Sequence, residues 1–344
     1  MKRHVKCSWC LSLLTQRWGT RKVGKRHIQK FKCFACGHIF SNRITKGKLT
    51  AKEKKNITKA HLEGRTSIRQ IVRDTGLARQ TIQNAIYETT KDCVDSVYIA
   101  KHLKPNWGGN LVIDGTTIRV YDWSAKHFRY KKAEKRYLHK LIWIVALDLK
   151  TLDIVHQFLC TEETMIDLIL FFKEIKNTGY DLKGLVTDGN MDIKRSAKMV
   201  YEKHFNFQLC NTHYIRGLRV KLREGKITNK RYEELKTAIY KGVWIPGLPK
   251  ELFTYQTVKE LPKTNQQIEN LFRQLKLRTH SINQFHSYDT AKAYLTAWSL
   301  ARRFTAFTDC RDKEKNHKAP LEIANCDIKN INYLELKTNI YLGR

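Results

Sequence analysis

Apolar side chains recur at helical spacing in several segments of this 344-residue chain. In residues 264–280, "TNQQIENLFRQLKLRTH", one apolar stripe predicts an amphipathic helix. The stripe consists of Ile268, Leu271, Phe272 and Leu275. Glu269 lies beside this stripe, and Arg273 follows one turn later. Taken alone, this pattern is typical of an i,i+4 ion pair on a solvated face, which contributes a few tenths of a kcal/mol.

Two shorter helical stripes occupy residues 66–90, "TSIRQIVRDTGLARQTIQNAIYETT", with Gly76 and Leu77 between them. Helix, glycine-containing turn and helix predict a helix-turn-helix, with residues 78–87 as the recognition helix. The side chains expected to face a DNA groove are Arg79, Gln80, Gln83 and Asn84, which are residue types that read base edges. A helical hairpin that serves only for packing is the alternative.

Apolar runs of strand length dominate residues 110–160. The stretch "NLVIDGTTIRVYDW" predicts a strand that ends at Asp114, a glycine and a second strand. The stretch "YLHKLIWIVALDLKTLDIVHQFLC" predicts two further strand-like runs, with residues 149–153 as the hairpin turn between them.

Helical and strand-like patterns alternate after this region. We predict a helix over 162–176, a short buried strand ending at Asp188, a helix over 192–204, a strand over 205–210 and a helix from His213. With the two runs on either side of Gly115 counted as one strand, the order is three strands, a helix, a fourth strand, a helix and a fifth strand, which is that of the ribonuclease-H-like α/β fold. In that fold the first and fourth strands lie side by side.

The composition is that of a globular but strongly basic chain, with 42% hydrophobic residues and 65 Lys and Arg against 32 Asp and Glu. A formal charge of +33 indicates a polyanionic partner, with nucleic acid first and an anionic membrane surface second. The longest apolar run, "LIWIVALDL", is far too short to span a bilayer. Because "MKRHVKCSWC" does not resemble a signal peptide, we expect an intracellular protein whose cysteines are reduced.

Four of the nine cysteines form a C-x2-C-x22-C-x2-C pattern, namely Cys7, Cys10, Cys33 and Cys36. Two such knuckles complete a tetrahedral Zn2+ site, so the spacing predicts a zinc ribbon with one structural zinc ion. The basic segment between the knuckles is expected to form two strands, and Gly37 is expected at positive φ. His38 is interpreted as a surface residue, and four reduced cysteines without metal are the alternative.

Asp114 and Asp188 each precede a glycine at a predicted strand end. If the first and fourth strands adjoin, these carboxylates come close together, and a divalent cation such as Mg2+ would relieve their repulsion. Two metal ions at such a site support cleavage of a phosphodiester. An ordinary Asp-Gly turn is the alternative for each.

Other aspartates compete for the same role. Asp122 lies on the second predicted strand, Asp148 ends a strand, Asp153 lies in the hairpin turn and Asp192 lies near a helix N-cap.

The stretches "VIDGTTIRV", "LVTDGN", "CNTH" and "TNQQIENLFRQLKLR" resemble the DDE transposases of prokaryotic insertion sequences, on the side related to the mutator-like transposases. The resemblance implies a catalytic triad of Asp114, Asp188 and Glu269 that holds two Mg2+ or Mn2+ ions. It also implies that Arg273, Lys276 and Arg278 lie along bound phosphates.

Cys210 and His213 match the C-x2-H signature of related transposases. We interpret them as a structural or DNA-positioning pair near the active site, and a core cysteine beside a helix-start histidine is the alternative.

The predicted organisation is α/β with two small N-terminal modules. Residues 1–46 form the zinc ribbon, 47–104 the helix-turn-helix domain, 105–310 the ribonuclease-H-like core with a helical insertion near 221–262, and 311–344 a tail that ends in a possible strand at 331–343.

The function that this organisation implies is DNA transposition. The protein would bind terminal inverted repeats of double-stranded DNA as a homodimer or larger assembly, cleave and join strands, and work in a prokaryotic cytoplasm, associated with the nucleoid. The alternatives are a catalytically retired DNA-binding regulator, a structure-specific nuclease of the same fold and a zinc-ribbon RNA-binding factor.

Overall fold

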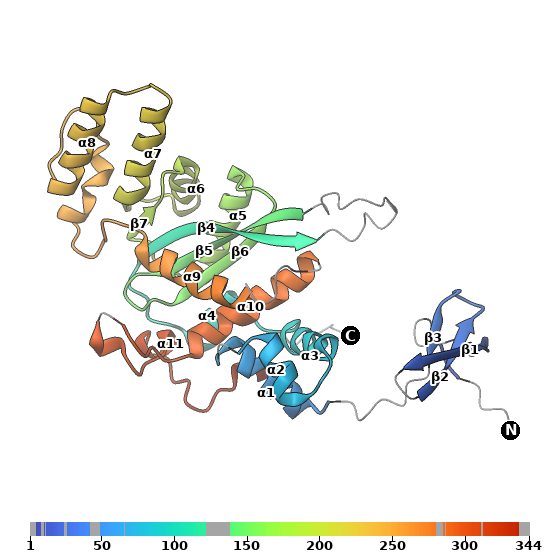
Figure 1. The fold of residues 1–344 in the computed structure, drawn as a ribbon. Coiled ribbons are helices and arrows are strands. Elements are labelled where there is room, and N and C mark those ends of the chain that lie inside the picture. The colour runs from blue at the N-terminus through green and yellow to red at the C-terminus, as the bar shows by residue number, and fades with distance from the viewer. Residues whose placement is uncertain are drawn as a thin grey trace. The chain divides into compact units, whose positions relative to one another are not determined.

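The computed structural model describes residues 5–7, 10, 12–23, 26–41, 49–64, 66–121, 138–279, 285, 287–310 and 312–336. The chain divides into two compact units, Met1–Thr50 and Ala51–Arg344 (Figure 1).

The first unit is built around a three-stranded antiparallel sheet in the order β1-β2-β3. Its strands are β1 (Thr15–Val23), β2 (Arg26–Cys33) and β3 (Ile39–Ser41). The two strands predicted between the cysteine knuckles are confirmed as β1 and β2, and β3 is an addition. Gly37 has a φ of 72°, as predicted for the turn after the last cysteine.

The second unit begins with four helices, α1 (Ala51–Leu62), α2 (Ile68–Thr75), α3 (Arg79–Thr90) and α4 (Ser96–Leu103). The hydroxyl of Ser67 caps α2 by accepting a hydrogen bond from the backbone of Gln70, and Gly76 ends it in the left-handed conformation. The helix, glycine turn and helix predicted over 66–90 are therefore confirmed as α2 and α3.

The centre of the second unit is a five-stranded mixed sheet in the order β6-β5-β4-β7-β8. Its strands are β4 (Asn110–Tyr121), β5 (Leu138–Asp148), β6 (Ile154–Cys160), β7 (Gly184–Thr187) and β8 (Asn206–Leu209). The pairs β4–β5 and β5–β6 are antiparallel, whereas β4–β7 and β7–β8 are parallel. The predicted α/β class and the predicted contact between the first and fourth strands of the sheet are confirmed.

The break predicted at Asp114 is wrong, because β4 continues without interruption for 12 residues. Gly115 pairs with Ile144 in the ladder to β5, so it makes no turn. A Cβ atom at Gly115 would lie 2.2 Å from Oε1 of Glu163. The glycine therefore leaves room for a neighbouring carboxylate, and the Asp-Gly turn interpretation fails at this position.

Helices cover both faces of the sheet (Figure 1). On one face lie α5 (Met165–Asn177) and α6 (Met191–Tyr201), and on the other lie α9 (Gln266–Thr279) and α10 (Tyr288–Phe304). Successive residues of a strand point to opposite faces. Ile144 accordingly joins the core beneath α5 and α6, whereas the ring of Trp143 lies 5.8 Å from the rings of Phe272 and Trp298 on α9 and α10.

The remaining elements are short or peripheral. They are α7 (Asn211–Arg223), α8 (Asn229–Lys241), α11 (Pro320–Ile323) and the 3-10 turns η1 (Lys250–Leu252), η2 (Thr254–Gln256), η3 (Lys313–Lys315) and η4 (Tyr333–Glu335). The helical character predicted for residues 221–262 is confirmed by α8, η1 and η2.

The strand predicted at 331–343 is wrong over its described part, residues 331–336, where Tyr333–Glu335 form the 3-10 turn η4 and no residue is in a strand. The consecutive residues Tyr333 and Leu334 are both buried, whereas a strand buries and exposes alternate side chains. The side chain of Asn332 caps the turn. The other residues of this prediction lie outside the described part of the chain.

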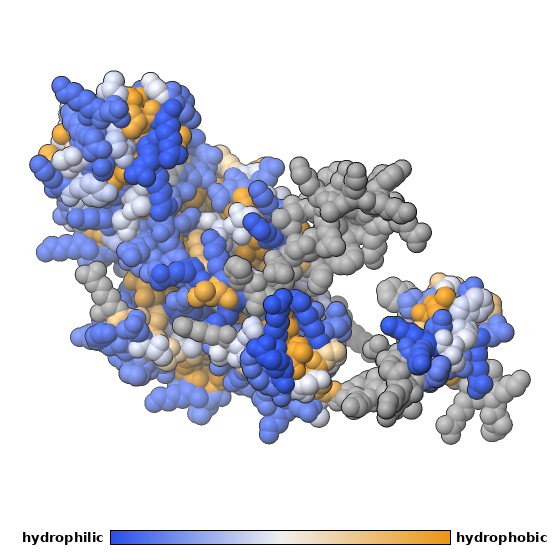
Figure 2. All heavy atoms as spheres, in the orientation of Figure 1, coloured by the Kyte–Doolittle hydropathy of each residue, from blue (hydrophilic) through white to orange (hydrophobic). Residues whose placement is uncertain are grey.

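Hydrophilic side chains dominate the face drawn in Figure 2. None of the helices in the described part of the chain is long and apolar enough to cross a membrane.

A buried ion pair joins α10 to the turn between β5 and β6. Nε and Nη2 of Arg303 donate to the two carboxylate oxygens of Asp153 at 2.8 and 2.7 Å. The indole of Trp107 donates to the same carboxylate at 2.9 Å. Burial raises the pKa of Asp153 and the Arg303 charge opposes that shift, so the carboxylate depends on its partner.

We expect Arg303→Met to lower the free energy of unfolding by about 3–5 kcal/mol, because it leaves the Asp153 carboxylate buried without its cation. Urea unfolding followed by circular dichroism measures this loss. Lys313→Met, which removes an exposed pair with Asp309, is the control and should cost less than about 1 kcal/mol. Equal effects of the two substitutions would contradict the role given to the buried pair.

Candidate active site

The first two candidate carboxylates come from the adjacent strands β4 and β7. Val112 pairs with Val186 in the parallel ladder, and two further steps along both strands bring Asp114 beside Asp188. Neighbouring strands lie about 4.8 Å apart, so the two side chains are close. Asp188 follows the last residue of β7, and its Oδ1 accepts a hydrogen bond from the backbone of Asn190 at 3.0 Å.

Glu269 belongs to α9, whose predicted apolar stripe is confirmed as buried: Ile268, Leu271, Phe272 and Leu275. Oε1 of Glu269 lies 3.6 Å from Nη1 of Arg216 and 3.8 Å from Nε2 of His213, both on α7. In the described part of the chain these are the basic side chains within 4 Å of its carboxylate. The alternative of an i,i+4 pair between Glu269 and Arg273 is therefore wrong, because the carboxylate lies beside α7 instead.

Asn265 connects the helix of Glu269 to the strand of Asp114. Its carbonyl accepts hydrogen bonds from the backbones of Ile268 and Glu269 at 3.1 and 3.2 Å, which places it at the start of α9. Its side-chain Nδ2 donates to Oδ2 of Asp114 at 2.8 Å, and the residue is only 1% exposed. The sequence analysis missed this contact, because an asparagine before a helix is usually interpreted as a cap.

Asp114 lies in a strongly anionic environment. Burial raises the pKa of Asp114 to about 7, with further contributions from the charges of Asp188, Glu269 and Glu163, while the backbone N–H of Gly115 opposes the shift. The three carboxylates predicted from the sequence therefore share one electrostatic neighbourhood.

Glu163 is a fourth carboxylate in this neighbourhood that the sequence analysis did not single out. It lies in the loop between β6 and α5, and its Oε2 accepts a hydrogen bond from Nδ2 of Asn190 at 3.3 Å. Burial and the charge of Asp188 raise its pKa. We expected residues 162–176 to be helical, but α5 begins at Met165, after Thr164 as its cap. No local pattern in the sequence indicates this position, because the close approach of Glu163 to Gly115 is a long-range contact.

Cys210 and His213 lie beside the same carboxylates. Sγ of Cys210 donates to Oδ1 of Asn265 at 3.2 Å and lies 3.4 Å from Nδ1 of His213. Cys210 is fully buried at the start of α7, and burial raises the pKa of its thiol. The pair thus links Asn265 to the side chains around Glu269, which fits a structural role; a contact with DNA remains a prediction.

The other candidate aspartates in the described part of the chain make contacts that stabilise the fold. The fully buried carboxylate of Asp148 accepts hydrogen bonds from Gly108, Thr151 and Tyr180. Asp153 binds Arg303, and the partly exposed Asp192 binds Arg195 at 3.1 Å in the first turn of α6. Asp122 lies outside the described residues.

The predicted DNA-contacting side chains fall into two groups. Arg79, Gln80 and Asn84 are exposed on α3 and Gln83 is partly exposed, so this helix presents a polar surface. Arg273, Lys276 and Arg278 do not share one face of α9, since an angle of 100° per residue places Arg278 opposite Lys276. Arg273 and Arg278 instead line a cavity that Lys276 does not reach.

The four cysteines of the first unit converge as predicted. Sγ of Cys7 lies 3.7 Å from Sγ of Cys36, and Sγ of Cys10 lies 3.5 Å from Sγ of Cys33. All four sulfur atoms lie within 4.8 Å of one another, and they form the one such metal-sized group in the described part of the chain. Four thiolates at tetrahedral spacing fit Zn2+.

The carboxylates are spread more widely than the cysteines, so they do not form such a compact group. Their oxygen donors nevertheless have the chemistry of Mg2+ or Mn2+ ligands, which keep several water molecules and need few protein ligands.

Neither a protein-family model nor a curated protein matches this chain. Among solved structures, the Drosophila P element transposase strand transfer complex is similar at 13% identity and a TM-score of 0.32, over 82% of this chain and 72% of that one. The Mos1 mariner paired end complex with Mn is similar at 10% identity and a TM-score of 0.22, over 68% of this chain and 82% of that one.

The raised pKa of Asp114 predicts a gain in stability when its charge is removed. The folded state binds this proton more tightly than the unfolded state, so stability falls as pH rises from about 4 to the folded pKa of about 7. Without added divalent metal, Asp114→Asn should raise Tm by about 3–6 °C at pH 8 and by less at pH 5. Differential scanning calorimetry measures both values.

The control for this measurement is Asp192→Asn, at a partly exposed position, which should change Tm by less than about 1 °C. A larger gain for Asp114→Asn at pH 5 than at pH 8 would contradict the electrostatic description of the site.

Proposed function

We propose that the protein is a DNA transposase of the DDE type, with a ribonuclease-H-like core that cleaves and joins DNA strands. The observation that carries this proposal is the convergence of Asp114, Asp188 and Glu269 from three elements far apart in the sequence. The strand order β6-β5-β4-β7-β8, which is 3-2-1-4-5 within the sheet, supports the ribonuclease-H-like assignment.

Asp114, Asp188 and Glu269 are the proposed holders of two Mg2+ or Mn2+ ions. When bound, these ions supply activation of the attacking oxygen and stabilisation of the leaving oxygen at a phosphodiester. Asn265 fixes the orientation of the Asp114 carboxylate through its 2.8 Å hydrogen bond. His213 and Arg216 hold Glu269 from the other side.

Positive charge near the carboxylates would bind the DNA backbone. The side chain of Arg216 is 60% exposed beside Glu269, so its guanidinium is accessible to a phosphate. Lys276 is exposed about two turns beyond Glu269 on α9. The overall charge of +33 makes binding steeply dependent on salt.

The N-terminal modules are the proposed readers of the element ends. In this proposal residues 1–46 form the zinc ribbon with one structural Zn2+, and α2 and α3 within 47–104 present Arg79, Gln80, Gln83 and Asn84 to the terminal inverted repeats. Residues 105–310 form the catalytic domain and 311–344 the tail. Because two ends must be paired, the active form is a homodimer or larger complex on double-stranded DNA in a prokaryotic cytoplasm.

The substrate for a test comes from the DNA flanking the gene at each copy in its genome, where inverted repeats bounded by short direct duplications mark the ends. On such an end, Asp188→Asn should lower cleavage by about 10²–10³-fold or more and leave the Kd for DNA within about twofold, because it removes a metal ligand and no phosphate contact. Gel assays of cleavage and strand transfer with Mg2+ measure both activities.

Asp192→Asn is the matched control, since it changes a neighbouring aspartate that pairs with Arg195, and it should retain activity. An Asp188→Asn variant that still cleaves would overturn the metal assignment. Cleavage without joined products would favour the nuclease, and wild-type protein that binds ends without cleaving them would favour the regulator.

A further inference from the structure

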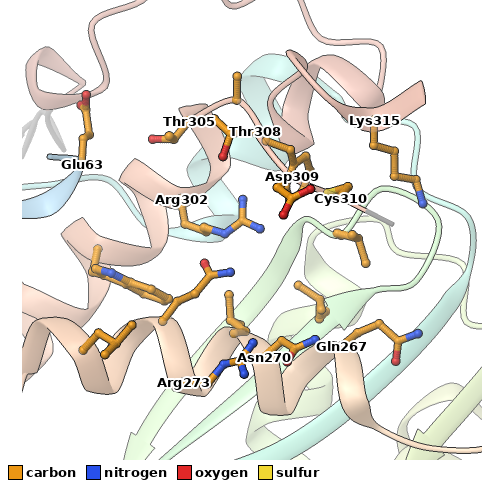
Figure 3. Close-up of a pocket in the computed structure, with 18 of the residues that line it drawn as sticks. Glu63, Gln267, Asn270, Arg273, Arg302, Thr305, Thr308, Asp309, Cys310 and Lys315 are labelled. Atoms are coloured by element: carbon orange, nitrogen blue, oxygen red, sulfur yellow. The ribbon is translucent and has the colours of Figure 1, made fainter. Parts of the chain in front are cut away.

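A cavity of about 980 Å³ lies between α9, α10 and the segment that follows α10 (Figure 3). None of the proposed catalytic carboxylates lines it, so it is distinct from the candidate active site. Its volume falls in the range of pockets that hold small organic ligands. The side chains of α9 that line it include Gln267, Asn270 and Arg273.

The cavity contains a buried cationic donor without an acceptor. Arg302 extends from α10 into the space (Figure 3), and its Nε is buried with no hydrogen-bond acceptor among the described residues. Its guanidinium packs 4.3 Å from the ring centre of Phe307, and burial lowers its pKa to about 10, so the group stays charged at neutral pH. A buried donor of this kind is costly unless a ligand supplies the acceptor.

The same cavity contains a buried acceptor without a donor. Oε1 of Gln267 is buried and finds no donor in the described part of the chain. Three more amide side chains from α9 also line the space: Gln266, Asn270 and Gln274. A carboxamide both donates and accepts hydrogen bonds. These side chains can therefore pair with a ligand edge that carries hydrogen-bond donors as well as acceptors.

The chemistry of the ligand follows from these two unsatisfied atoms. An inorganic phosphate would satisfy Arg302 but has no strong donor for Gln267. A nucleotide supplies both, because its phosphate accepts and the edge of its base carries donors and acceptors. The nearly buried Leu147, Leu271 and Trp298 form an apolar part of the lining that suits the faces of a base. The rim acids Asp309 and Asp312 are paired with Lys313 and Lys315.

We propose that this cavity holds one unpaired nucleotide of a DNA strand, with its base at Gln267 and the apolar lining and its phosphate at Arg302 and Arg273. Arg273 follows Glu269 by one helical turn, a Cβ separation of about 6 Å. A strand that places a phosphodiester at Glu269 therefore passes the cavity within one or two nucleotides. The assignment of a nucleotide as the ligand rests on the cavity alone. The further step, that this nucleotide belongs to a DNA strand, rests on the function proposed above.

The test compares two DNA duplexes on the full-length chain carrying Asp188→Asn, without added Mg2+. One 20-base-pair duplex is blunt, and the other has a two-nucleotide 3′ overhang with 2-aminopurine as a fluorescent base. We expect the overhang duplex to bind about tenfold more tightly, with a change in 2-aminopurine emission. Gln267→Ala and Arg302→Lys should each reduce that preference at least threefold, because each removes one partner of the nucleotide.

Lys292→Ala is the matched control, since Lys292 is exposed on α10 and does not line the cavity. It should weaken both duplexes equally, because it removes only a non-specific charge. The ratio of the two Kd values is taken on one protein sample, so partial misfolding of a variant does not change it. Metal-free binding also separates this result from any failure of cleavage.

Three results would overturn the proposal. The first is that the Asp188→Asn chain with an unchanged cavity shows no preference for the overhang. The second is that the preference survives both cavity substitutions. The third is that free dAMP displaces the 2-aminopurine overhang at micromolar concentration. The last result would assign the cavity to a free nucleotide rather than to a DNA strand.

Discussion

The parallel pairing of β4 with β7 is the constraint on which the rest of the second unit depends. Backbone hydrogen bonds fix its register, and that register brings Asp114 beside Asp188, although 73 residues separate them in the chain. Every other feature of the site is arranged around this pair. The helix of Glu269 packs on the opposite side of the strand from α5, and Asn265 ties its first turn to Asp114.

In the absence of a cation, bringing these carboxylates together lowers the free energy of unfolding. Asp114, Asp188, Glu269 and Glu163 lie in one neighbourhood, and burial of Asp114 adds to their mutual repulsion. The surrounding residues limit this cost through specific contacts: Asn265 donates to Asp114, Asn190 donates to Glu163, and the cation of Arg216 on α7 lies beside Glu269. A chain with a formal charge of +33 thus brings four carboxylates together at one edge of its sheet.

Much of this arrangement could be predicted from the sequence, because the periodicity of apolar residues and the spacing of cysteines are local properties of the chain. The four cysteines, the helices around Gly76 and the buried stripe of α9 all follow from such patterns. The contacts that could not be predicted are long-range. Nothing near Glu269 in the sequence indicates Arg216 as its partner in place of Arg273, and nothing near Gly115 indicates that its missing side chain leaves room for Glu163. These depend on how α7 and α5 pack against the sheet.

The most direct test of the central claim is a crystal structure of the chain with Mn2+, using anomalous scattering to locate the metal. We expect manganese peaks within coordination distance, about 2.0–2.3 Å, of carboxylate oxygens of Asp114, Asp188 and Glu269. We also expect a zinc signal at the four cysteines. Absence of a manganese peak at these carboxylates, in crystals whose cysteine site holds zinc, would contradict the metal assignment.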